Sequence, residues 1–166
     1  GRRTRRIAIV RIASAAFGLW VVASAFVHRL PHAVTDRSGA PIMAGAEITP
    51  SVAEAFNHAC IDCHSEKTHW PWYSNLAPMS WLIEGDVKRA RSRMNLSRWD
   101  GIDTAEQRGL LTAIATVIEN HEMPPQRYLM QHPQAKLSAE DFAKVIEWTR
   151  AERRRLRVSV DAVSNK

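Results

Sequence analysis

The first apolar block of the chain predicts a helix that can cross a membrane. Residues 7–27 are apolar or small apart from Arg11, and a run of about 20 such residues spans the hydrocarbon core of a bilayer. Arginines precede the block, so the positive-inside rule leaves that end in the cytoplasm and exports the rest. A cleaved signal peptide is the alternative, because Ala23-Ser24-Ala25 has the small-x-small form. We expect a retained anchor, since the chain includes these residues.

The pattern after this block predicts helices only. Residues 28–48 contain prolines and glycines without an apolar period, which indicates a linker. The predicted helices begin at Pro50 with Thr49 as the cap, after Ser80, at Asp103 and after Leu137-Ser138. At each start a capping residue precedes apolar residues three and four positions apart. The first leads to Cys60, the third ends at Asn120, and the last runs to Arg153-Arg154-Arg155. No strand run is present, so the expected fold class is all-α.

The helix expected over 81–93 has an apolar and a basic face. Trp81, Leu82 and Val87 are expected to point inward. The outward residues are Lys88, Arg89, Arg91 and Arg93. This basic face is either solvated or a docking surface for an acidic redox partner.

Composition excludes a polyanion-binding body. The chain has 166 residues, a length typical of one domain, and a formal charge of +6. The excess positive charge lies at the two ends of the chain, because residues 2–11 carry +5 and residues 150–166 are also basic. Residues 28–149, in contrast, hold 12 basic and 15 acidic side chains. We therefore expect no nucleic-acid partner.

The only two cysteines stand in Cys60-Ile61-Asp62-Cys63-His64. This C-x-x-C-H spacing is typical of covalent haem attachment, with one thioether from each cysteine to a haem vinyl group and His64 as an axial iron ligand. A thioredoxin-like pair is the first alternative, but no strand pattern precedes Cys60. The others are a zinc site completed by His121 and a disulfide across one turn.

A second iron ligand is expected from Met123. It stands in Met123-Pro124-Pro125, where two prolines stiffen an extended loop, and a thioether is a soft ligand that raises the reduction potential of haem. A buried core methionine is the alternative role. The rival ligands are His121, Met130, His132, Met79 and Met94.

An aromatic loop follows the cysteine motif. Trp70, Trp72 and Tyr73 stand in a segment rich in proline and poor in period. Aromatic rings bury large areas, and their N–H and O–H groups can reach haem propionates. We expect these three side chains to wall the haem, the alternative being a loop core.

Together these segments resemble the bacterial haem-binding domain, a small c-type-cytochrome-like module. The resemblance rests on the following stretches: Cys60-Ile61-Asp62-Cys63-His64-Ser65, Thr68-His69-Trp70-Pro71-Trp72-Tyr73-Ser74-Asn75, Ala77-Pro78, Trp81, Asn95-Leu96-Ser97-Arg98-Trp99, Met123-Pro124-Pro125, Tyr128, His132-Pro133 and Leu137-Ser138. It covers about residues 47–150 and implies one covalent haem c in a cytochrome-c-like helical fold. His64 and Met123 are then the iron ligands, and Tyr128 is counted with the cofactor-binding residues.

The sequence thus predicts a membrane-anchored mono-haem electron carrier rather than a stand-alone catalyst. The expected division is an anchor over 1–27, a linker over 28–48, a haem domain over 49–157 and a tail over 158–166. The haem domain is expected in the periplasm of a bacterium, on a single-pass inner-membrane anchor. Its partner is a redox protein or a larger membrane complex of which it is a subunit. The alternatives are a haem peroxidase with an open sixth position, and a haem-containing sensor or structural subunit.

Overall fold

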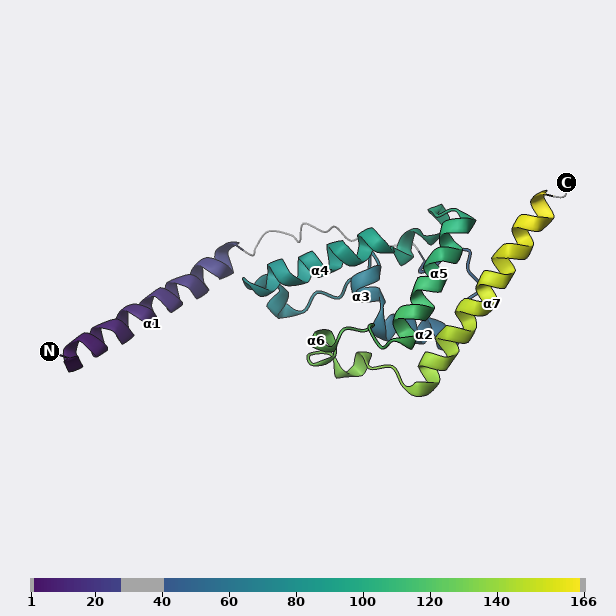
Figure 1. Ribbon diagram of the computed structural model, residues 1–166. Helices are drawn as coiled ribbons and strands as arrows, with labels where there is room; N and C mark the ends of the chain where they lie inside the picture. The colour runs from purple at the N-terminus through teal and green to yellow at the C-terminus, as the bar shows by residue number, and fades with distance from the viewer. Residues whose placement is uncertain (1, 28–40, 165–166) are drawn as a thin grey trace. The chain divides into compact units, whose positions relative to one another are not determined.

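The computed structural model describes residues 2–27 and 41–164, and all regular structure within them is helical (Figure 1). The elements are α1 (Arg2–Val27), α2 (Pro50–Ala59), α3 (Ile61–His64), η1 (Trp72–Asn75), α4 (Met79–Arg93), η2 (Leu96–Gly101), α5 (Thr104–Glu119), α6 (Gln126–Leu129), η3 (Pro133–Ala135) and α7 (Ala139–Ser164). The predicted all-α class is confirmed. The chain forms two compact units, residues 1–34 with 70–86 and residues 35–69 with 87–166.

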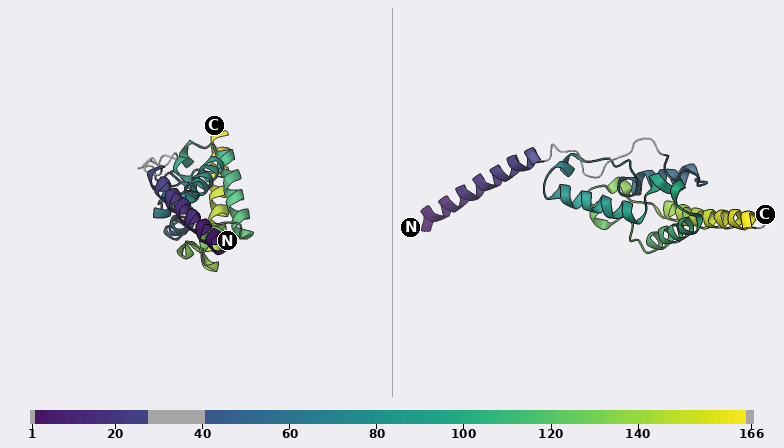
Figure 2. Two further views of the ribbon diagram at one scale, coloured as in Figure 1. Left: turned by 90° about the vertical axis from the view of Figure 1, so that its left-hand side faces the viewer. Right: turned by 90° about the horizontal axis from the view of Figure 1, so that it is seen from above.

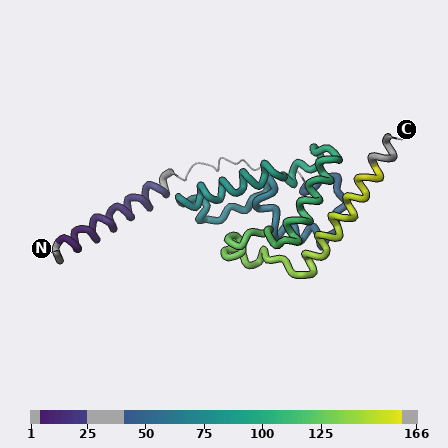
Figure 3. Tube along the Cα trace, viewed as in Figure 1, coloured from purple at the N-terminus to yellow at the C-terminus, as the bar shows by residue number. Residues whose placement is uncertain are grey.

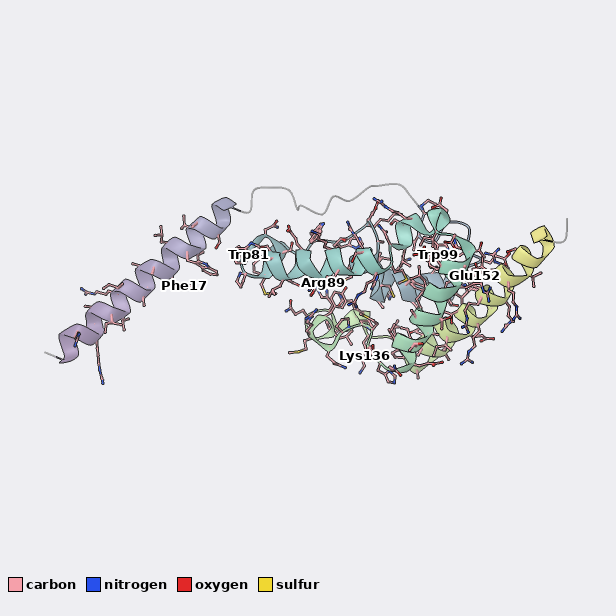
Figure 4. The ribbon with its side chains drawn as sticks, turned by 45° about the horizontal axis from the view of Figure 1, so that its top comes forward. Phe17, Trp81, Arg89, Trp99, Lys136 and Glu152 are labelled. Atoms are coloured by element: carbon pink, nitrogen blue, oxygen red, sulfur yellow. The ribbon has the colours of Figure 1, made fainter. Side chains whose placement is uncertain are left out.

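The first unit contains the apolar helix α1. Its stretch Arg5–Ser24 has a mean hydropathy of 1.9, and among the described residues it is the one helix long and apolar enough to cross a membrane. Large apolar side chains such as Phe17, labelled in Figure 4, are exposed along it. Helix α1 is therefore either a signal sequence or a single membrane span.

The start of α4 differs from the prediction. Trp81 and Leu82 are 67% and 58% exposed, whereas Val87 is buried. The inward orientation expected for Trp81 and Leu82 is wrong, because α4 joins the unit that has the apolar core only from Val87 onward. The cap expected from Ser80 is also wrong, since the helix already begins at Met79.

The core of the second unit lies between α2, α5, η2 and α7. It is built from buried apolar side chains: Met43, Val52, Ala55, Phe56, Leu96, Trp99, Leu111, Ile114, Ile118, Leu137, Val145, Trp148 and Leu156. Phe56 of α2 meets Trp148 of α7 edge-on, with ring centroids 5.5 Å apart. Aromatic pairs of this geometry add stability beyond the area that they bury. Met43, from the stretch expected as linker, is fully buried in this core.

The predicted capping residues open and close these helices. Thr49 caps α2 through its hydroxyl oxygen, and Asp103 caps α5 by accepting the amide of Glu106 at 3.0 Å. Ser138 caps α7 reciprocally with Asp141, as in a capping box. Helix α7 continues to Ser164, past the arginines expected at its end; Figure 3 traces it to the C-terminal part of the chain.

Candidate functional site

The two cysteines and His64 lie within one helical turn. Helix α2 ends where Cys60 donates its amide to the Phe56 carbonyl at 2.9 Å, and α3 starts at the next residue. The His64 amide then bonds to the Cys60 carbonyl at 2.9 Å, and the buried Ile61 anchors the turn. Both thiols are partly buried. The turn from Cys60 to His64 thus carries two sulfurs and an imidazole.

The His64 ring is oriented by a backbone carbonyl. Its Nδ1 lies 3.1 Å from the carbonyl oxygen of Met94, which directly follows α4. A carbonyl only accepts hydrogen bonds, so Nδ1 carries the proton and Nε2 keeps its lone pair. A metal-binding histidine is commonly held in its tautomer in this way.

The surroundings keep His64 and Cys60 neutral. Burial lowers the pKa of His64 and the charge of Arg93 acts in the same direction, against hydrogen bonds to the Met94 and Ala90 carbonyls. Burial and the neighbouring Cys63 raise the pKa of Cys60 to about 12. Redox-active cysteine pairs typically have a lowered pKa, so this environment does not favour the thioredoxin-like alternative.

A buried carboxylate fastens the end of the motif to η2. Glu66 is 5% exposed and accepts hydrogen bonds from Asn95 Nδ2 at 3.0 Å and from Arg98 Nε at 2.6 Å. The Glu66 amide donates to Ser97 Oγ at 2.9 Å. The stretch 95–99 is one of those on which the family resemblance rests, and it supplies the partners that hold the chain after His64.

Asp62 connects the motif to two further segments. Its Oδ2 accepts a hydrogen bond from the Tyr128 hydroxyl at 2.9 Å, and its Oδ1 accepts one from the His69 amide at 3.1 Å. The Asp62 carbonyl accepts from Thr68 Oγ1 at 2.7 Å, and Arg91 donates to the same hydroxyl at 2.8 Å. Arg91, expected on the outward basic face, is therefore partly a support of the motif loop.

Met123 leaves helix α5 through a defined turn. His121 has φ 55°, its amide bonds to the Ile118 carbonyl at 3.0 Å, and the Glu122 amide bonds to the Val117 carbonyl at 2.9 Å. This pair of bonds is the Schellman motif that ends many helices, and it confirms Asn120 as the C-cap. Met123 follows directly and is partly buried.

The rival ligands have other surroundings. Met130 is 83% exposed, and the His132 ring stacks on Tyr128 with centroids 4.4 Å apart. His121 packs edge-on against Phe142 at 4.9 Å. Met94 packs against the core of the second unit. Within the residues that the structure describes, no group of three or more His, Cys, Asp and Glu could hold a metal ion, which gives the zinc alternative no support.

The structure brings some predicted site residues together and leaves others apart. Cys60, Cys63 and His64 share a turn, and Tyr128 contacts that turn through Asp62. Trp70, Trp72 and Tyr73 belong to the first unit, where Trp72 is 77% exposed and packs edge-on against Tyr73 at 5.8 Å. Their role as a haem wall stays a prediction.

A comparison with protein families shows which family this chain belongs to. The sequence model described as the haem-binding domain matches residues 19–151, most of the chain. The chain belongs to the haem-binding domain family. The predicted resemblance is thus confirmed, and haem is the cofactor that the family binds. Neither the search of curated proteins nor that of solved structures found a match.

The residues of this haem-binding domain fit that cofactor. An imidazole with its tautomer fixed by a carbonyl suits a nitrogen ligand to iron, and two thiols that could attach the haem precede it by one and four positions. Sequence reasoning missed the Met94 carbonyl, the Glu66 contacts and the Asp62 contacts. Of the residues that make these contacts, the sequence pointed only to the stretch 95–99 and to Tyr128, because both belong to the stretches on which the family resemblance rests.

Proposed function

We propose that this haem-binding domain carries one covalent haem c and transfers single electrons on the periplasmic side of a bacterial inner membrane. The observation that carries the proposal is the hydrogen bond between His64 Nδ1 and the Met94 carbonyl, on the turn that holds both cysteines. It supports a neutral imidazole whose Nε2 lone pair is available to iron.

Each side chain of the site has a separate role in this proposal. The Cys60 and Cys63 thiols would hold the haem covalently, each by adding its S–H across one vinyl group to give a thioether. His64 Nε2 and the Met123 thioether sulfur would be the two ligands to the haem iron. The bound group supplies a one-electron ferric/ferrous couple, and thioether ligation raises its reduction potential.

The hydrogen bond between Asp62 and Tyr128 supports a site in which iron would keep the same ligands in the ferric and ferrous states. It ties the cysteine turn to the segment that begins with Met123-Pro124-Pro125, only five positions before Tyr128. Prolines restrict the backbone of this segment. With both ligand-bearing segments held together, an electron can enter or leave with little rearrangement.

Helix α1 supports the proposed location. We propose that it is retained as a single membrane span with its arginine-rich end in the cytoplasm. A tethered domain meets membrane-bound donors and acceptors at a raised effective concentration. Its partner is accordingly a periplasmic redox protein or a membrane complex that contains this chain as a subunit.

Optical spectra of purified Met123→Ala test the ligand assignment. In wild type we expect low-spin absorption in both redox states and a sulfur-to-iron band at the red end of the oxidised spectrum. Met123→Ala should lose that band and become high-spin, whereas Met130→Ala, at an exposed position, should match wild type. A high-spin wild type unaffected by Met123→Ala would contradict the assignment and favour a peroxidase.

A further inference from the structure

A cavity lined by arginines lies between α5 and α7 and has no residue of the cysteine turn in its lining. Its volume is about 400 Å³, and its lining residues are Arg108, Arg150, Arg153, Arg154 and Arg157. The four arginines on α7 recur at spacings of three and four residues, which places them along one side of the helix. The cavity therefore concentrates positive charge from two helices of the same unit.

Two contacts fix how these helices meet. Arg153 donates to Thr112 Oγ1 at 2.8 Å, and Arg150 pairs with Glu119 at 3.2 Å. Later residues of α7 thus meet earlier residues of α5, and Figures 1 and 2 show the two helices side by side. This antiparallel arrangement brings Arg157 level with Arg108 at the cavity.

The charge in this cavity is largely uncompensated. Glu119 neutralises Arg150, but among the described residues no carboxylate pairs with Arg108, Arg154 or Arg157. Like charges three or four positions apart repel each other and destabilise a helix. A bound anion would remove this repulsion.

Two donors in the cavity lining lack an acceptor among the described residues. The Nε atoms of Arg108 and Arg153 are buried and have no hydrogen-bond acceptor within the part of the chain that the structure describes. Buried N–H groups almost always have an acceptor, and an exception calls for an ion or water. The Nε edge of a guanidinium presents two parallel N–H groups, which match two oxygens of one oxyanion.

We propose that the cavity between α5 and α7 binds a phosphate group. A phosphate accepts hydrogen bonds from several directions, so arginines on two helices can bind it at once. A cavity of about 400 Å³ also leaves room for a group attached to the phosphate, such as a phospholipid headgroup. The lining that the structure describes consists of arginines and offers no apolar side chain for a protein partner to contact, which favours a small phosphate-bearing group. This site is independent of the haem ligands.

Calorimetric titration of the full-length, haem-loaded protein in micelles of an uncharged detergent tests this site. Inorganic phosphate should bind saturably to wild type, and the double variant Arg154→Gln/Arg157→Gln should bind at least tenfold more weakly. The matched control is Lys67→Gln/Lys136→Gln, which removes the same charge from exposed positions outside the cavity; its affinity should stay within twofold of wild type. Unchanged haem spectra in all three proteins show that each is folded.

A second titrant distinguishes the sources of phosphate. Glycerophosphoglycerol, the soluble headgroup of phosphatidylglycerol, should bind more tightly than inorganic phosphate if the site takes a lipid, and less tightly if it takes free phosphate. Absence of saturable binding for both, or equal weakening in the arginine and lysine variants, would overturn the proposal. Binding of a polyglutamate peptide without binding of either phosphate would also overturn it, in favour of an acidic protein partner.

Discussion

The Tyr128 hydroxyl donates a hydrogen bond of 2.9 Å to Oδ2 of Asp62, a residue 66 positions earlier in the chain. Asp62 stands between the two cysteines, and Tyr128 closes the segment that starts at Met123. The bond therefore joins the two parts of the chain that carry the proposed iron ligands.

A double-mutant cycle on this pair should reveal coupling. We expect a coupling free energy of about 0.5–1.5 kcal/mol between Asp62→Ala and Tyr128→Phe, the usual net contribution of one hydrogen bond. Urea unfolding of the haem-loaded proteins measures it. Tyr128→Phe should also weaken the sulfur-to-iron band, because the Met123 segment is held less firmly. Strictly additive single effects would show that the contact does not join the segments.

Substitutions of Glu66 and of Arg98 should lower the free energy of unfolding by different amounts. Glu66 is 5% exposed, whereas the Arg98 side chain is 58% exposed. Arg98→Ala removes one charged donor from a buried carboxylate, a loss expected to cost about 1.5–3 kcal/mol. Glu66→Gln leaves Arg98 accessible to water and keeps an acceptor for Asn95, so about 1–2 kcal/mol is expected. Urea unfolding at pH 7 gives both values, and the reverse order would contradict this assignment.

The capping box of α7 should make stability depend on pH. Hydrogen bonds from the Ser138 side chain and amide lower the pKa of Asp141 below its usual 3.8. A carboxyl with a lowered pKa in the folded state stabilises the protein above the unfolded pKa, and this contribution is lost as pH falls through the folded pKa. Asp141→Asn should thus cost about 0.5–1 kcal/mol at pH 7 and less at pH 3.

The control for this substitution is Glu147→Gln, an exposed position on the same helix. Its cost should stay small at both pH values, because surface substitutions away from caps usually have little effect. Urea unfolding at pH 7 and pH 3 provides the comparison. A cost of Asp141→Asn that is the same at both pH values would rule out the carboxylate as the capping group.

Local sequence signals predicted the parts of this structure that depend on neighbours in the chain. The C-x-x-C-H spacing placed Cys60, Cys63 and His64 on one turn, and Asp103 and Asn120 marked the ends of α5. The extended backbone expected from the proline pair is confirmed at Pro125, whereas Met123 and Pro124 lie in a bend. These features follow from capping and backbone preferences that a few adjacent residues determine.

Local sequence patterns did not predict contacts between residues that are far apart in the chain. The partner of His64 is the backbone carbonyl of Met94, and every residue type has a carbonyl, so no sequence pattern marks it. Trp81 has the composition of a core residue but starts a helix segment outside the core unit. The arginines of α7 fitted a helix end, whereas the helix continues to Ser164 and places them beside α5.

The most direct test of covalent haem attachment is the mass of the unfolded polypeptide. Wild type and the Cys60→Ser/Cys63→Ser variant are exported from cells with a competent cytochrome c maturation pathway, denatured and analysed by mass spectrometry. The account predicts that the wild-type chain retains the mass of one haem after denaturation and that the variant does not. A wild-type chain with the mass of the bare polypeptide would contradict it.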